Sequence, residues 1–164
     1  MKLQYNVGMC LESSPKLWFS HSKLQNPDFL NTILKSQIIG LVETQHIAED
    51  ADKLHILGYK CYQVCRKKKK FGRKHGGIAV YIHESILGGV SRVPTPGSES
   101  IILKLNKDFF QLDKDTIVTF CYCVPANSSY ARRTNFDPYH DLEEKLGGFV
   151  ESMIRYAWVT LTPE

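Results

Sequence analysis

Two kinds of hydrophobic spacing alternate along this chain, one expected of helices and the other of buried strands. The first helical stretch follows Asn26-Pro27-Asp28. Asparagine can cap a helix, and an acid in the first turn faces the positive end of the helix dipole. Proline loses no hydrogen bond in the first turn, because an N–H group there has no partner within the helix. The pattern therefore predicts a helix that begins at Pro27. Its apolar side chains would share one face: Phe29, Leu30, Ile33 and Leu34.

Short apolar runs predict the strands. Residues 37–42 form such a run, which ends at Glu43 and is typical of a strand buried on both faces. Residues 58–65 and 77–82 predict a hairpin whose connecting loop is rich in lysine. A looser alternation predicts a first strand, and β-branched and aromatic runs predict two later ones: residues 2–7, 100–105 and 116–124.

A second helix is predicted from Pro138, because Asp137 repeats the capped-proline start. Gly147-Gly148 weakens its middle by about 1 kcal/mol per glycine. The order of strand, helix, strand, hairpin, two strands and helix predicts a layered α+β sandwich in which helices cover sheets. Apolar residues at steps of three and four extend the pattern of this helix: Tyr139, Leu142, Leu146, Val150 and Met153.

The composition is that of one folded domain. The chain has 164 residues, of which 43% are hydrophobic, enough for a core of ordinary size. An odd count of five cysteines, without a Cys-x-x-Cys pair, argues against a disulfide framework and a zinc ribbon. No stretch approaches about 20 uninterrupted apolar residues, and the first ten residues lack a leader pattern. We therefore expect an intracellular protein, nuclear or cytoplasmic, with no membrane partner.

The formal charge of +4 is modest, but the basic residues are concentrated. Residues 66–74 hold seven cations within nine positions, from Arg66 through the lysine run to Arg73 and Lys74. Such a cluster can hold phosphate backbones or act as a nuclear import signal, and it can equally keep a hairpin tip solvated. Composition alone leaves these readings open.

Four short motifs resemble, in their order, the endonuclease/exonuclease/phosphatase family, and most closely the apurinic-endonuclease-like domains of non-LTR retrotransposons. The resemblance covers about residues 22–146 and implies an incomplete four-layer α/β sandwich of the DNase I-like type. It divides the chain into a partial domain, residues 1–146, and a divergent carboxyl-terminal extension of the last helix, residues 147–164. The motifs are Ile38-Ile39-Gly40-Leu41-Val42-Glu43-Thr44, Gly58-Tyr59, His75-Gly76-Gly77-Ile78-Ala79-Val80-Tyr81-Ile82 and Tyr122-Cys123-Val124-Pro125-Ala126-Asn127-Ser128-Ser129-Tyr130.

The resemblance implies a magnesium-dependent endonuclease that hydrolyses phosphodiester bonds of DNA. By position, Glu43 matches the family's glutamate ligand of the catalytic magnesium, and a carboxylate suits a hard dication. Tyr122 matches the tyrosine whose phenol lies near the phosphate and helps to stabilise the transition state. Apart from the motifs, the same residues would be a solvated strand end and a core aromatic.

Nucleic-acid contacts are expected from the loops. Asn127 lies in the loop where the family approaches the nucleic acid, and Arg132 and Arg133 follow it. Arginine is suited to bidentate phosphate contact. In the basic run, Arg73 and Lys74 are candidates of the same kind, which makes DNA a candidate partner of residues 66–74.

A second metal ligand is harder to align. The family's first strand carries an asparagine that helps to bind the metal, and Asn6 offers this amide, but it lies 43 − 6 = 37 positions before Glu43. The usual spacing would fall near Lys16, whose ammonium group cannot ligate a metal. Asn6 is the candidate ligand if a loop is inserted after the first strand.

The family's later Asp-x-Asn and Ser-Asp-His motifs do not occur in these 164 residues. They orient the attacking water, contact the metal and handle protons, so we expect little catalysis by this chain alone. Sheet faces and edges that the absent portion would cover are expected to stay open, which favours self-association. The alternatives are a non-catalytic module that binds nucleic acid and a protein-interaction fragment.

Overall fold

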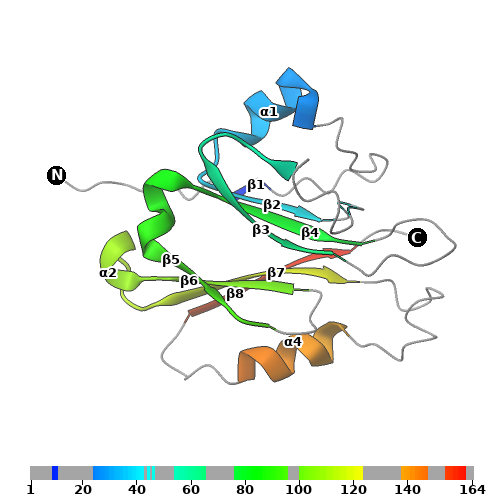
Figure 1. The fold of residues 1–164 in the computed structure, drawn as a ribbon. Coiled ribbons are helices and arrows are strands. Elements are labelled where there is room, and N and C mark those ends of the chain that lie inside the picture. Colours follow the sequence, from blue (N-terminus) through cyan, green and yellow to red (C-terminus); the bar gives the residue numbers. More distant parts are fainter. Residues whose placement is uncertain are drawn as a thin grey trace, which may run out of the picture.

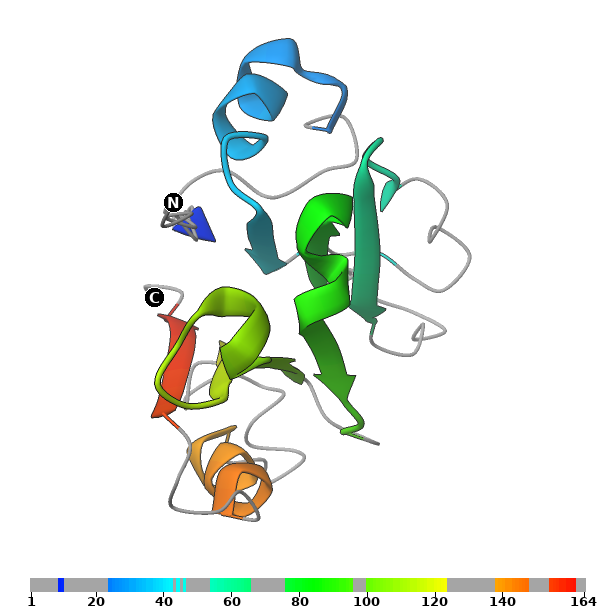
Figure 2. The same ribbon diagram turned by 90° about the vertical axis from the view of Figure 1, so that its left-hand side faces the viewer.

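Two four-stranded β-sheets face each other in the computed structural model, with one helix packed on the outside of each sheet (Figure 1). The structure describes residues 9–10, 24–42, 44, 46, 54–65, 76–95, 100–123, 138–147 and 154–161. The view turned by 90° shows the same stacking, with α1 (Pro27–Ile33) on one outer side and α4 (Pro138–Gly147) on the other (Figure 2). The layers are therefore helix, sheet, sheet and helix.

The first sheet has the strand order β1-β2-β4-β3. Its central strand β2 pairs in parallel with β1 and antiparallel with β4, and β3 pairs antiparallel with β4 as the second arm of a hairpin. The β1-α1-β2 segment is thus a crossover unit that places α1 over the sheet. The bounds are Met9–Cys10 for β1, Ile38–Val42 for β2, Tyr59–Val64 for β3 and Ile78–His83 for β4.

The second sheet has the strand order β5-β6-β7-β8. The strands β5, β6 and β7 pair antiparallel in this order, and β7 also pairs in parallel with β8, which follows it through the crossover helix α4. A 3₁₀ helix η3 (Glu84–Gly89) joins the two sheets, and the short helix α2 (Lys107–Phe110) joins β6 to β7. The strand bounds are Val90–Val93, Ser100–Leu105, Thr116–Cys123 and Ile154–Leu161.

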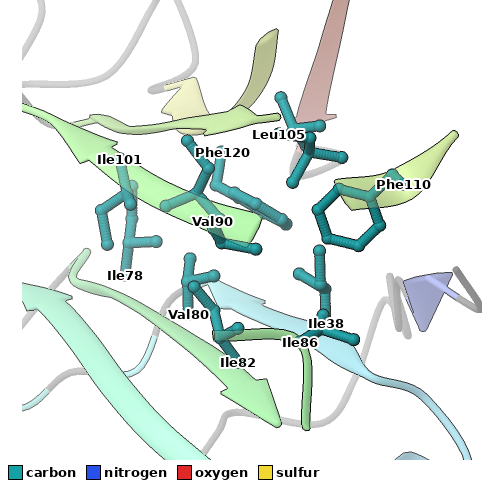
Figure 3. Packing of buried hydrophobic residues seen from close by; sticks show 12 residues of the cluster. Ile38, Ile78, Val80, Ile82, Ile86, Val90, Ile101, Leu105, Phe110 and Phe120 are labelled. Carbon is teal, nitrogen blue, oxygen red and sulfur yellow. The ribbon is translucent and has the colours of Figure 1, made fainter. Parts of the chain in front are cut away.

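The main hydrophobic core lies between the sheets (Figure 3). Alternate residues of each strand point into it, so that the side chains of β2 and β4 meet those of β5, β6 and β7. Ile38, Val80 and Phe120 are almost completely buried there. Further residues of this core are Ile78, Ile82, Ile86, Val90, Ile101, Leu103, Leu105, Phe110 and Val118.

The outward faces of both sheets are also apolar and carry the helices. Ile33 of α1 packs on Ile39 and Tyr81, which point away from the main core. On the other sheet, Leu146 of α4 packs on Ile117 and Ile102. The described side chains of β2, β4, β6 and β7 are buried on both faces over most of each strand, which fits the largely apolar sequences of these strands.

Most sequence-predicted elements are present. The helix begins at Pro27, and Asn26 caps it with its side-chain oxygen, which accepts from the backbone N–H groups of Asp28 and Phe29. The predicted hairpin, the strand at residues 38–42 and the layered α+β sandwich are confirmed. Of the apolar residues expected on one face of this helix, Ile33 is buried and Phe29 and Leu30 are half-buried. Leu34 follows the last helical residue as its carboxyl cap and is exposed.

The chain after α4 differs from the prediction. Residues 147–164 were expected to extend the last helix, whereas α4 ends at Gly147 and residues 154–161 form β8. The glycine pair disfavours continuation of the helix, and the β-branched and aromatic residues of Ile154–Leu161 favour a strand. The predicted strand at residues 2–7 lies outside the described residues. The sequence analysis also missed β5, η3 and α2.

A glycine allows the two sheets to approach each other. A Cβ atom built on Gly40 of β2 would lie 2.4 Å from two ring carbons of Phe120 on β7. Carbon atoms that are not bonded cannot come this close, so only glycine fits at position 40 without a shift of the ring. The contact joins the central strand of one sheet to the central strand of the other.

Gly40→Ala is expected to destabilise the fold by about 1–3 kcal/mol, because the added methyl group overpacks the main core. Urea unfolding followed by circular dichroism measures this loss. Gly147→Ala is the matched control, since a Cβ atom there would meet no other atom within 4 Å. Gly40→Ala with unchanged stability would show that the sheets do not pack as closely as described, and Gly40→Ala combined with Phe120→Leu should recover part of the loss.

Candidate functional site

The central strands β2 and β7 end at the same edge of the sandwich. Their arrows point to the same side in Figure 1, and Gly40 meets Phe120 across the main core. Val42 is the last residue of β2, and Cys123 is the last residue of β7. We call this side of the molecule the carboxyl edge. Residues that directly follow central strands often carry the chemistry of layered α/β proteins, so this edge is the candidate functional site.

Of the sequence-predicted site residues, the described part of the chain contains only Tyr122, and of it only the backbone. Tyr122 is the next-to-last residue of β7 and pairs with Thr160 of β8, so its backbone lies at the carboxyl edge. Glu43 lies outside the described residues, between Val42 and Thr44, which are both described. The other candidates also lie outside them: Asn6, Arg73, Lys74, Asn127, Arg132 and Arg133.

The chain just beyond β2 is held against the start of β4. Thr44 donates its backbone N–H to the carbonyl oxygen of Gly77 at 3.2 Å, one step past the last strand pair, Val42 and Ile78. Gly76 and Gly77 have φ values of 74° and 90°. Residues with a Cβ atom rarely adopt this backbone, so the glycine pair is needed to bring the Gly77 carbonyl to this position.

A buried polar pair follows at the same place. The Thr44 hydroxyl group is hydrogen bonded to Nδ1 of His46, and the two residues are 1% and 3% exposed. Breaking this hydrogen bond would leave buried polar atoms without a partner, which costs free energy. The bond therefore favours a single backbone conformation at Thr44 and His46. The sequence analysis did not single out His46. No spacing rule distinguishes it from an exposed histidine.

Two of the described thiols, Cys61 and Cys121, are shielded by burial. Burial raises the pKa of Cys61 from 9.0 to about 11, and Cys121 is 5% exposed under α4. A raised pKa keeps the thiol protonated near neutral pH, and the thiolate is the reactive form.

The described residues contain no group of three or more histidine, cysteine, aspartate or glutamate side chains that could hold a metal ion. The donors expected from the sequence are the carboxylate of Glu43 and the amide oxygen of Asn6, and hard oxygen donors of this type suit magnesium. Within the described ranges, no helix has the length and apolar character needed to cross a lipid bilayer.

The order of layers and the paired central strands define an incomplete α/β sandwich of the DNase I-like type, the fold of the endonuclease/exonuclease/phosphatase proteins. The chain superposes on the human Nocturnin catalytic domain with a TM-score of 0.51 and 13% identity, over 82% of this chain and 55% of that one. It superposes on the AP endonuclease LMAP from Leishmania major with a TM-score of 0.54 and 16% identity, over 83% and 48%. The chain thus spans about half the length of these structures.

At the level of sequence, no protein-family model and no curated protein matches the chain. The likeness to the two structures therefore concerns the fold, and it confirms the architecture expected from the four motifs.

Thr44→Val is expected to lower the free energy of unfolding by about 1–3 kcal/mol, because it keeps the volume of the side chain and leaves Nδ1 of His46 without the hydroxyl group. Thr44→Ser, which retains the hydroxyl group, is the control and should lose less. Urea unfolding of both variants measures the difference. Equal stability of Thr44→Val and the unsubstituted protein would contradict a structural role for the hydrogen bond.

Cys61 is expected to react with iodoacetamide about a hundred times more slowly at pH 8 in the folded protein than in urea, because its pKa of about 11 leaves little thiolate. The raised pKa also means that folding favours the protonated thiol. This contribution to stability is complete below pH 9 and is lost as the pH rises towards 11. Peptide mass spectrometry measures the labelling rate, and equal rates in both states would show that the thiol is not shielded.

Proposed function

We propose that this chain is part of a nuclease domain that acts on the phosphodiester backbone of DNA, with its site at the carboxyl edge. One observation carries the proposal: the two strands that lead to Glu43 and contain Tyr122 are the central strands of the two sheets and end side by side at one edge. In a DNase I-like fold, residues at these strand ends can act on one phosphate group from both sheets.

In this proposal Glu43 and Asn6 hold a magnesium ion, and Tyr122 donates a hydrogen bond to the phosphate. Magnesium, when bound, would neutralise charge on the scissile phosphate group. The phenol of Tyr122 would stabilise negative charge that develops on a phosphate oxygen. The Thr44–His46 pair keeps the backbone that follows Glu43 in one conformation, and so helps to orient the carboxylate.

The finer assignment, to the apurinic-endonuclease-like domains of non-LTR retrotransposons, is supported by the order of the four sequence motifs. The 164 residues contain neither an Asp-x-Asn nor a Ser-Asp-His motif. Where several groups act together in hydrolysis, the absence of some of them removes nearly all of the hydrolysis rate. We therefore propose that these residues bind DNA and cleave it inefficiently on their own.

A non-catalytic role in nucleic-acid binding is the second candidate. It is favoured by the end of β3, because Val64 lies beside Ile78 at the carboxyl edge and the basic run, residues 66–74, begins two residues later in sequence. Arg73 and Lys74 in this run, and Asn127, Arg132 and Arg133 after β7, would then contact phosphate groups without hydrolysis.

Nicking of supercoiled plasmid by the purified chain in magnesium separates the two candidates. We expect at most slow nicking, abolished by Glu43→Gln and lowered at least about tenfold by Tyr122→Phe. Glu43→Gln preserves the size of the side chain and also controls for contaminating nuclease. Circular dichroism and urea unfolding must show that the variants remain folded.

Nicking that Glu43→Gln leaves unchanged would refute the proposed site. No nicking by the folded chain, together with salt-dependent binding of DNA, would support the non-catalytic role.

A further inference from the structure

The side of the sandwich formed by β3 and β5 carries an ordered pair of cations. These strands are the edge strands of the two sheets. Tyr62 and Val64 of β3 pack against the main core, and Lys60 shares their face because side chains alternate along a strand. Arg92 of β5 shares the face of Val90 in the same way. Both cations thus stand where the space between the sheets opens to solvent.

Tyr62 holds the two cations together. The Nζ atom of Lys60 lies 5.2 Å from the centre of the Tyr62 ring, and Cζ of Arg92 lies 5.7 Å from it. These distances are in the range of cation–π contacts. The contacts restrict two long side chains that would otherwise be free, which lowers the entropy cost of a further interaction.

The charges of this pair are available for an anion. Lys60 and Arg92 are exposed, and neither forms an ion pair with a carboxylate of the described residues. By contrast, Lys104 of the neighbouring strand β6 is bound to Asp115 at 2.8 Å, and this contact lowers the pKa of the aspartate. The positive charge of Lys60 and Arg92 is therefore not neutralised within the described part of the chain.

Lys60 lies on the strand that precedes the basic run in sequence. The register of β3 on β4 places Lys60 opposite Ile82, Tyr62 opposite Val80 and Val64 opposite Ile78, so that β3 runs towards the carboxyl edge. Residues 66–74 follow directly in sequence. From Lys60 to Val64 the strand rises about 13 Å. Measured along the helix axis of duplex DNA, this length holds about four phosphate groups of one strand.

We propose that Lys60 and Arg92, positioned by Tyr62, form a contact site for the phosphate backbone of a nucleic acid. This site extends the binding surface from the carboxyl edge along the side of the sandwich formed by β3 and β5. We name this pair with Tyr62 the lateral site. The inference rests on the proposed function for its ligand class, a nucleic acid, but it does not require hydrolysis. Inward-pointing charges on edge strands also prevent sheets from aggregating. The experiment must separate these two roles.

The test compares two double variants that remove the same charge. Lys60→Gln combined with Arg92→Gln removes both cations of the lateral site. Lys35→Gln combined with Lys114→Gln is the matched control, because both lysines are exposed and directly precede β2 and β7, at the edge opposite to the carboxyl edge. Each pair of substitutions lowers the formal charge from +4 by two units. Non-specific effects of net charge are therefore equal.

Binding of a fluorescent 20-base-pair DNA duplex is measured by anisotropy in EDTA over a series of KCl concentrations. We expect the lateral-site variant to lose about tenfold in affinity per contact at 0.1 M salt, and its slope of log affinity against log salt to fall by about 0.9 per contact. The control variant should keep the slope of the unsubstituted protein. Tyr62→Leu, which changes no charge, should lower the affinity several-fold if the ring positions the cations.

Three outcomes would overturn the proposal: equal slopes and affinities of the two double variants, aggregation of the lateral-site variant without a change in affinity, and no binding of the duplex by the unsubstituted protein. The second outcome would assign the cations to edge protection. Because EDTA removes magnesium, the result is independent of the nicking assay. Loss of binding in the lateral-site variant together with no nicking would support the lateral site and refute hydrolysis by this chain.

Discussion

The close approach of Gly40 to Phe120 is the constraint on which the arrangement of the molecule depends. It sets the two central strands face to face across the main core, and each central strand organises its own sheet through one parallel and one antiparallel neighbour. Since β2 and β7 run in the same direction, a contact in their middle also aligns their ends. A functional site shared by both sheets therefore needs tight packing in the core, some distance from the residues that would carry out the chemistry.

The alternation of buried residues explains which parts of the fold could be predicted from the sequence. Ile38–Val42 is a continuous apolar run, and Thr116–Cys123 is rich in β-branched and aromatic residues, so both interior strands were predicted. The edge strand Val90–Val93 is short and half polar, so it carried no such signal. The error at residues 147–164 has a related cause: Val150 and Met153 continue the helical spacing of α4, and only the glycine pair and the β-branched residues beyond it favour β8.

The strands that lead to the candidate site could be predicted from the sequence, whereas the site residues themselves stay predictions. The motifs placed Glu43 and Tyr122 at strand ends, and the sheet topology brings the ends of these two strands to one edge. The Thr44–His46 hydrogen bond and the cation pair on Tyr62 could not be predicted. The hydrogen bond depends on the backbone path just after β2, and the cation pair depends on how the edge strands of the two sheets meet. The spacing of residues along the sequence encodes neither contact.

The two polar features of the described structure act on different terms of the binding free energy. The Thr44–His46 pair is buried, so salt does not screen it, and its effect is to hold the backbone next to Glu43 in one conformation. The cations of the lateral site are exposed, so their contribution to binding comes mainly from counterion release and depends on salt. A nucleic acid held along β3 would be retained near the carboxyl edge even where hydrolysis is slow. Under the proposed function, affinity and catalysis depend on different residues of the same sandwich, so substitutions should separate them.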